Sequence, residues 1–175
     1  EVKLLLSLFE ESINMYVQDL HNNNVKLSFI GDMTQFSDKL LSSINDSEKL
    51  TEYNTGLKLN FAINYGGKWD IVNSFNEFSK SKKYLSPSKK ITHKDLEPHL
   101  SLGGSSVDLL IRTAGHQRIS NFMLWQHAYT ELYFTNCLWP DFDEKELDLA
   151  IKHYFKTTRK FGSLVQINQS IKEDA

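Results

Sequence analysis

Hydrophobic residues recur along this chain in two patterns, a spacing of three and four residues typical of helices and short runs typical of strands. The helical spacing predicts helices over 1–22, 35–50, 68–78 and 143–158. The short apolar runs predict strands over 25–30, 57–63, 107–111 and 131–134. Shorter helices are expected at 92–99 and 121–128. Because strands and helices alternate, the pattern predicts an α/β fold with a parallel central sheet flanked by helices.

The apolar run at 107–111 breaks abruptly into a polar loop that holds Arg112, His116, Arg118 and Ser120. Open α/β sheets bind their ligands where strands end in such loops. Two guanidinium groups and a hydroxyl can surround one phosphate or diphosphate, because arginine stays charged and forms paired hydrogen bonds. The alternative is that both arginines pair with surface acids and that the aromatic residues after the loop are ordinary core.

Two other segments leave a similar choice open. The loop at 64–67 contains Gly66 and Gly67, and its backbone amides could approach an anion or form a plain turn. The first predicted helix has a wide apolar stripe, which Leu4 and Leu8 extend. Such a stripe fits a helix that faces the core, and it fits the wall of an apolar ligand tunnel equally well.

The composition of the chain limits its domain size, the kinds of ligand it can bind and the compartment in which it works. At 175 residues, of which 40% are hydrophobic, the chain has the size of one domain with a sizeable core. Its formal net charge of -2 argues against a general nucleic-acid-binding protein, so any anion site must be local. The single cysteine, Cys137, excludes an intramolecular disulfide and is expected to be a small buried hydrophobe in a reducing compartment. No apolar run approaches the roughly 20 residues that span a bilayer, and we expect a cytoplasmic protein.

The other candidate metal ligands form no metal-site pattern. Outside the loop the histidines are scattered and are expected at the surface, namely His21, His93, His99, His127 and His153. Asp141 and Asp143 resemble a metal pair, but a rigid turn and a helix cap explain them better, with Glu146 completing a capping box for Asp143. The lysine-rich segment at 80–94 is expected to be a solvated surface segment.

The chain contains, in this order, the runs NTGLKLNFAINYGGKWDIV, DLLIRTAGHQRISNFMLWQHAYTELYF and LWPDFDEKEL. Together they closely resemble the cis-prenyltransferase family, and within it the bacterial undecaprenyl diphosphate synthases. The resemblance spans residues 1–162 and implies one domain over that range, followed by a C-terminal tail at 163–175. It implies a magnesium-dependent homodimeric enzyme that condenses isopentenyl diphosphate repeatedly onto farnesyl diphosphate with cis geometry. The product would be undecaprenyl diphosphate, the lipid carrier of cell-wall synthesis, through which the protein would make at most peripheral membrane contact.

The resemblance also assigns roles to single residues. Arg112, Arg118 and Ser120 match the residues that bind the diphosphate of isopentenyl diphosphate. Glu131 matches an acidic residue linked to magnesium and to the dimeric active site, and Glu1 matches an acid just after the family's substrate-proximal Ser-x-x-Asn-Trp segment. The positions that line the product tunnel of the family are matched by Leu5, Leu8, Phe9 and Leu57.

Departures from the family pattern limit what the chain is expected to do. The family's Asp-Gly-Asn-Gly-Arg-Trp segment, which holds farnesyl diphosphate and magnesium, does not occur here. No catalytic residue is therefore assigned, and the chain by itself is expected to be inactive. His116 stands where the family has a glutamate and is a candidate for proton transfer or diphosphate contact, while Lys160 replaces an arginine. Two alternatives stay open, a non-catalytic subunit of a prenyltransferase and a diphosphate-binding α/β module.

Overall fold

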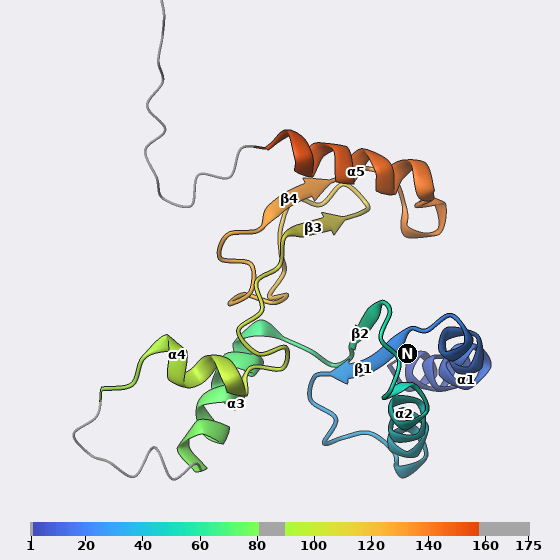
Figure 1. The fold of residues 1–175 in the computed structure, drawn as a ribbon, viewed down its shortest axis with the longest axis vertical. Coiled ribbons are helices and arrows are strands. Elements are labelled where there is room, and N and C mark those ends of the chain that lie inside the picture. The colour runs from blue at the N-terminus through green and yellow to red at the C-terminus, as the bar shows by residue number, and fades with distance from the viewer. Residues whose placement is uncertain (1, 81–89, 158–175) are drawn as a thin grey trace, which may run out of the picture. The chain divides into compact units, whose positions relative to one another are not determined.

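The computed structural model describes residues 2–80 and 90–157 and shows an α/β chain with parallel strands and flanking helices (Figure 1). The elements in chain order are α1 (Val2–Asn22), β1 (Lys26–Ile30), α2 (Asp38–Thr51), β2 (Lys58–Ala62), α3 (Gly67–Lys80), α4 (His93–Leu96), η2 (Glu97–His99), β3 (Leu109–Arg112), β4 (Glu131–Phe134), η3 (Trp139–Asp141) and α5 (Glu144–Lys156). Glu1, most of the lysine-rich segment, Lys160 and the tail at 163–175 lie outside the described residues. The predictions that fall on them stay predictions.

The chain divides into two compact units, which are described separately. Unit 1 comprises residues 1–104 and 121–123, and unit 2 comprises residues 105–120 and 124–175. Each holds one pair of parallel strands, β1 with β2 and β3 with β4. Across the described part of the chain, the helices are all too short or too polar to traverse a lipid bilayer.

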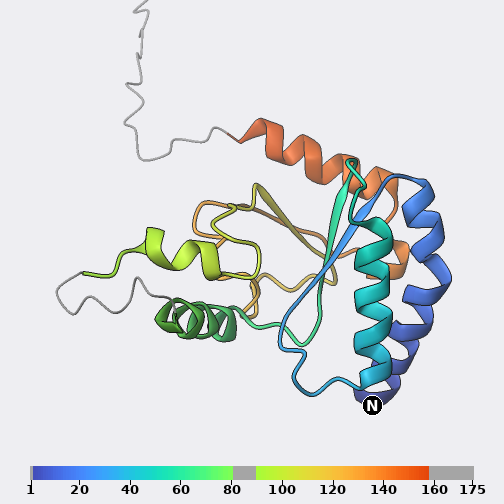
Figure 2. The same cartoon turned by 60° about the horizontal axis from the view of Figure 1, so that its bottom comes forward.

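In unit 1, the helices α1 and α2 run side by side against the β1–β2 sheet (Figure 2). The strands pair in parallel register from Lys26 opposite Lys58 to Ile30 opposite Ala62. Alternate residues of β1 point to the helices, which places Leu27 and Phe29 in a core with Ile13, Leu40 and Ile44. Each such buried side chain stabilises the fold by about 1.5–3 kcal/mol.

The outer edge of β1 is covered by side chains of α2. The amide of Leu27 donates to Oγ1 of Thr51 at 3.0 Å, and the amide of Phe29 donates to Oε1 of Glu48 at 2.9 Å. These bonds satisfy two amides on the edge of β1 that faces away from β2.

The helix α3 is fixed to the turn after η2 by a buried carboxylate. Asp70 is 1% exposed and accepts hydrogen bonds from the hydroxyl of Tyr65 at 2.8 Å and from the amide and hydroxyl of Ser101 at 2.9 and 2.7 Å. Burial is the larger cause that raises the pKa of Tyr65 well above its usual value, and the hydrogen bond and negative charge of Asp70 add to it. The predicted short helix at 92–99 is confirmed as α4 and η2, with Thr92 and Asp95 forming a capping box.

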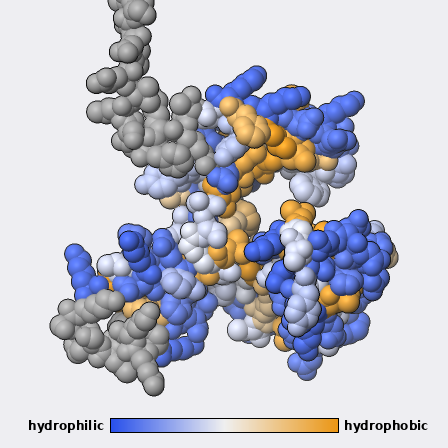
Figure 3. Space-filling model, viewed as in Figure 1, coloured by the Kyte–Doolittle hydropathy of each residue, from blue (hydrophilic) through white to orange (hydrophobic). Residues whose placement is uncertain are grey.

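In unit 2, β3 and β4 pair in parallel from Leu109 opposite Glu131 to Arg112 opposite Phe134. The helix α5 packs on β4, with Ala150 fully buried and the rings of Tyr133 and His153 5.4 Å apart. Figure 3 shows apolar surface over this sheet, where Leu132 is one of the exposed large hydrophobics.

The predicted helix at 121–128 is wrong. The structure has consecutive turns there, because Ser120, Asn121 and Met123 adopt positive φ angles of 45°, 62° and 45°. Left-handed residues cannot continue a right-handed helix. The predicted cap of α5 by Asp143 is confirmed, since its Oδ1 accepts from the amides of Lys145 and Glu146, both at 3.0 Å. The predicted capping box is wrong, because the carboxylate of Glu146 accepts from the hydroxyl of Thr135 instead.

Candidate functional site

The polar loop predicted from the sequence follows β3 and is pinned to the segment that follows β4. We call residues 112–120 the arginine loop. The amide of Thr135 donates to the carbonyl of Arg112 at 3.0 Å, the amide of Gly115 to the carbonyl of Thr135 at 2.9 Å, and the amide of Ala114 to the carbonyl of Cys137 at 2.9 Å. The first turn of the loop is therefore held by main-chain hydrogen bonds beyond the end of the sheet.

The turn itself needs unusual backbone angles. Ala114 and Gly115 have φ angles of 64° and 72°. A Cβ atom on Gly115 would lie 2.6 Å from Oδ1 of Asn136, the end of an exposed side chain that can move, so the positive φ is what favours glycine here. Ala114 has no such freedom, and its left-handed conformation costs roughly 1–2 kcal/mol.

The structure brings together Arg112, Arg118 and Ser120. Nη1 of Arg112 donates to Oγ of Ser120 at 2.9 Å and, through a second short contact, to the carbonyl oxygen of Arg118. Arg112 is half-buried, while Arg118 and Ser120 are exposed. The guanidinium of Arg118 and the hydroxyl of Ser120 are therefore exposed to solvent, while the guanidinium of Arg112 is hydrogen-bonded within the loop.

The ion-pair alternative for the arginines is wrong for the part of the chain that the structure describes. Within it, the salt bridges are Glu10 with Lys39 at 2.5 Å and Glu77 with Lys80 at 2.6 Å, and neither arginine takes part. Arg118 therefore keeps its charge and its donors available for a ligand. His116 lies in the same loop and is exposed.

Glu131 lies at the other end of the sheet from the arginine loop. It pairs with Leu109 at the start of β4, while Arg112 pairs with Phe134 at its end. The two positions are three residue steps apart along the strands, which corresponds to about 10 Å. The structure therefore does not bring Glu131 together with Arg112, Arg118 and Ser120.

The described residues contain no group of three or more histidine, cysteine, aspartate or glutamate side chains able to hold a metal ion. His93 and His153 are exposed as expected, whereas His21, His99 and His127 are half-buried. Burial lowers the pKa of His127.

An apolar cavity of 260 Å³ lies between α1 and the β1–β2 sheet. Of the predicted tunnel residues, Phe9 lines this cavity. Leu5, Leu8 and Leu57 are 61%, 50% and 68% exposed and lie outside its lining. The rest of the lining is formed by Ser12, Ile13, Tyr16, Leu20, Leu27, Phe29 and Phe61.

At the end of the loop at 64–67, the first two amides of α3 are occupied within the protein. The amide of Gly67 donates to the carbonyl of Asn121 at 2.7 Å, and the amide of Lys68 donates to Oδ1 of the same residue at 2.9 Å. Asn121 thus satisfies the start of α3 in the way that an N-cap does. This finding favours the plain turn.

Comparison with known proteins identifies the family. The family model described as putative undecaprenyl diphosphate synthase matches residues 1–162. The chain belongs to this family. It is 46% identical over 164 residues to the ditrans,polycis-undecaprenyl-diphosphate synthase, (2E,6E)-farnesyl-diphosphate specific, of Coxiella burnetii, which covers 93% of this chain and 69% of the relative.

Solved structures agree with this assignment to the undecaprenyl diphosphate synthase family. Lavandulyl diphosphate synthase from Lavandula x intermedia, in complex with dimethylallyl diphosphate, is similar with a TM-score of 0.85 and 36% identity over 93% of this chain and 71% of that one. A probable undecaprenyl diphosphate synthase from Campylobacter jejuni gives a TM-score of 0.80 and 30% identity over 93% and 74%.

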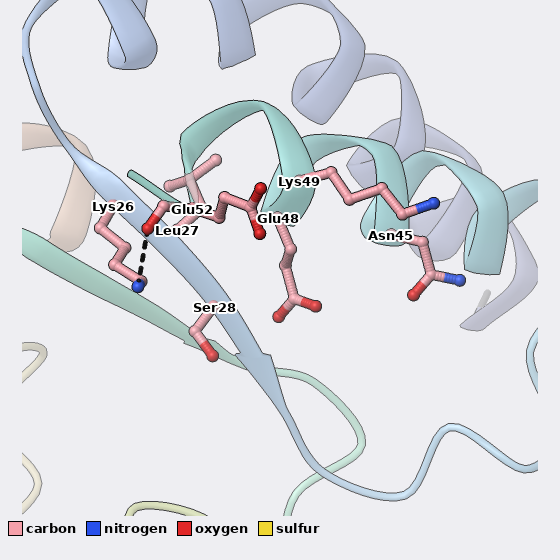
Figure 4. Close-up of a pocket in the computed structure, with 7 residues that line it drawn as sticks. All are labelled: Lys26, Leu27, Ser28, Asn45, Glu48, Lys49 and Glu52. Carbon is pink, nitrogen blue, oxygen red and sulfur yellow. Dashed lines mark hydrogen bonds between the residues drawn. The ribbon is translucent and has the colours of Figure 1, made fainter. Parts of the chain in front are cut away.

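Sequence reasoning missed most of the residues around the apolar cavity of this family member. Leu27, Phe29 and Phe61 come from strands, and their alternation was the available signal, but nothing in it distinguished a cavity wall from solid core. A second groove, of 370 Å³, runs beside the outer edge of β1, and most of the residues that line it are polar or charged (Figure 4). There Nζ of Lys26 donates to the carbonyl of Glu52 at 2.9 Å, and the groove was not predicted.

Proposed function

We propose that this protein is a cis-prenyltransferase that condenses isopentenyl diphosphate successively onto farnesyl diphosphate with cis geometry, giving undecaprenyl diphosphate. The family model and the names of relatives such as the Coxiella burnetii enzyme support this function. In each condensation a carbon–carbon bond forms, the allylic diphosphate leaves, and the incoming unit loses a proton. The diphosphate of isopentenyl diphosphate stays on the product, so a site must hold it while the other end of the molecule reacts.

The observation that carries the proposal is the geometry of the arginine loop. Arg118 is exposed and free of ion pairs among the described residues, and its planar fork suits paired hydrogen bonds to phosphate oxygens. Ser120 accepts a hydrogen bond from Arg112, which leaves its own O–H free to donate to the anion. Arg112 adds positive charge behind the hydroxyl. We assign Arg112, Arg118 and Ser120 to the diphosphate of isopentenyl diphosphate.

The apolar cavity beside Phe9 suits the hydrocarbon part of the product. Its lining is almost entirely apolar, and it lies on the sheet face that α1 covers. A volume of 260 Å³ holds only a part of a long prenyl chain. Leu5, Leu8 and Leu57 are exposed and would contact a chain that extends beyond the cavity.

We propose Mg²⁺ as the cofactor and Glu131 as one of its ligands. A lone carboxylate fits Mg²⁺ only if diphosphate oxygens and water supply the remaining positions, and this ion is commonly bound in that way. When bound, Mg²⁺ would neutralise charge on the diphosphate. Because Glu131 lies about 10 Å along the strands from the arginine loop of its own chain, we propose that it acts across a homodimer. Glu1 and His116 stay candidates for substrate contact.

Calorimetric titration with isopentenyl diphosphate tests the proposal. The wild-type protein is expected to bind, and Arg118→Ala is expected to weaken binding at least about tenfold, the loss of one charge-assisted contact. Lys152→Ala is the matched control, because it removes one positive charge from the exposed surface of α5 in the same unit. Equal affinities for the wild type and Arg118→Ala would contradict the proposal. Inorganic pyrophosphate binding as tightly as isopentenyl diphosphate would favour a general diphosphate-binding module.

A further inference from the structure

The start of the arginine loop is held by a short segment outside it, residues 135–137. Thr135 donates its amide to the carbonyl of Arg112 and accepts at its own carbonyl from the amide of Gly115, at 3.0 and 2.9 Å. The third contact, from the amide of Ala114 to the carbonyl of Cys137, comes from the same short segment. Any change in the path of residues 135–137 must therefore displace the start of the loop.

The side chain of Thr135 fixes that path. Its Oγ1 accepts from the amide of Cys137 at 3.1 Å and donates to Oε2 of Glu146 at 3.1 Å. Glu146 lies in the first turn of α5, where its amide is held by the Asp143 cap at 3.0 Å. A continuous series of hydrogen bonds thus runs from α5 through the Thr135 hydroxyl to the backbone of the arginine loop.

The loop needs this support because its backbone is strained. Ala114 occupies the left-handed region at a φ of 64°, and such residues persist only where surrounding contacts hold them. The same backbone sets the positions of Arg112, which precedes the turn, and of Arg118 and Ser120, which follow it. The Thr135 hydroxyl is half-buried together with Glu146, so water can replace neither partner freely.

We propose that Thr135 and Glu146 are positioning residues for the diphosphate site, holding the arginine loop in the conformation that binds isopentenyl diphosphate. Neither residue touches the ligand in this scheme. The inference rests on the proposed function for the identity of the ligand, whereas the claim that Thr135 and Glu146 hold the loop does not. Protection of the loop amides and affinity for the ligand are therefore measured separately.

The test combines amide hydrogen exchange with calorimetric titration of isopentenyl diphosphate. Thr135→Val keeps the shape of the side chain and removes the hydroxyl, whereas Thr135→Ser keeps the hydroxyl. Glu146→Ala removes the acceptor, whereas Glu146→Gln keeps an acceptor oxygen and removes the charge. Thr135→Val and Glu146→Ala are each expected to lower protection of the Ala114 and Gly115 amides about tenfold and to raise the Kd about tenfold, the effect of one lost hydrogen bond. Thr135→Ser and Glu146→Gln are expected to stay within about threefold of the wild type for both readouts.

Unchanged protection in Thr135→Val and Glu146→Ala would overturn the inference whatever the affinity. Lost protection with unchanged affinity would overturn it as well, because the loop conformation would then not matter for binding. A wild type that fails to bind isopentenyl diphosphate would overturn the proposed function, while protection of Ala114 and Gly115 would still report on the loop. If Thr135→Val does not fold, as judged by circular dichroism, Glu146→Ala decides the same question.

Discussion

Arg112 and Ser120 are joined by a hydrogen bond of 2.9 Å from Nη1 to Oγ, which spans the arginine loop from its first residue to its last. The same nitrogen contacts the carbonyl oxygen of Arg118. Arg112 therefore closes the loop into a ring, and Arg118 remains exposed on it. The two arginines of the loop thus differ in their surroundings, since Arg112 is hydrogen-bonded within the loop and Arg118 faces solvent.

Removing the Arg112 side chain is expected to weaken binding of isopentenyl diphosphate more than removing the hydroxyl of Ser120. Arg112→Ala loses a charge and both contacts that close the loop, which predicts a rise in Kd of about 30-fold or more. Ser120→Ala loses the hydroxyl that donates to the ligand and accepts from Arg112, but it keeps the charge of Arg112 and its contact with the Arg118 carbonyl, and it predicts a rise of about tenfold. Calorimetry at fixed ionic strength measures both, with Lys152→Ala as the charge control. An Arg112→Ala variant that binds as the wild type does would show that the ring is unimportant.

Ala114 and Gly115, the left-handed residues of the first turn of the loop, are expected to respond to substitution in opposite ways. Gly115→Ala would place an L-residue at a φ of 72°, so we expect a loss of roughly 1–2 kcal/mol in the free energy of unfolding. Ala114→Gly relieves an unfavourable φ of 64°, and we expect a gain of up to about 1 kcal/mol after the greater entropy of the unfolded chain is subtracted. Urea denaturation measures both changes. Stabilisation by Gly115→Ala would contradict the described turn.

The thiol of Cys137 is expected to react slowly at neutral pH. Partial burial is the larger cause that raises the pKa of Cys137 above that of a free cysteine. The negative charges of Glu146, Asp141 and Asp143 raise it further. Since the thiolate is the reactive form, a raised pKa lowers its fraction at any pH below that value and moves the rate profile to higher pH. Alkylation by iodoacetamide between pH 7 and 10 measures the midpoint. Glu146→Gln removes one of the causes and should move the midpoint part of the way back, whereas no movement would place Glu146 away from the thiol.

Much of the fold could be predicted from the spacing of apolar residues. The helix α1 and the strands β1 and β4 have strong local patterns, and their predicted limits lie within one residue of the observed ones. The segment at 121–128 could not be predicted, because Asn121 adopts a left-handed conformation while its carbonyl and side chain bind amides of α3. That contact joins residues more than fifty positions apart, and no local pattern reports it.

The candidate site, in contrast, could be predicted from the sequence, because its residues lie close together along the chain. Arg112, Arg118 and Ser120 lie in one short stretch, so a single loop sufficed to bring them together. The support from Thr135 and Glu146 was not predicted. Glu146 was assigned to a capping box with Asp143, but its carboxylate accepts a hydrogen bond from Thr135, eleven positions away. Which of two polar partners a side chain chooses depends on packing that the sequence does not state.

The central claim is that the arginine loop binds the diphosphate of isopentenyl diphosphate, and nuclear magnetic resonance tests it most directly. Backbone amide shifts of the ¹⁵N-labelled protein would be followed during titration with isopentenyl diphosphate, for the wild type and for Arg118→Ala. We predict saturable shifts concentrated at residues 112–120 in the wild type, and strongly weakened shifts in Arg118→Ala. Shifts that leave residues 112–120 unchanged, or that are equal in both proteins, would contradict the claim.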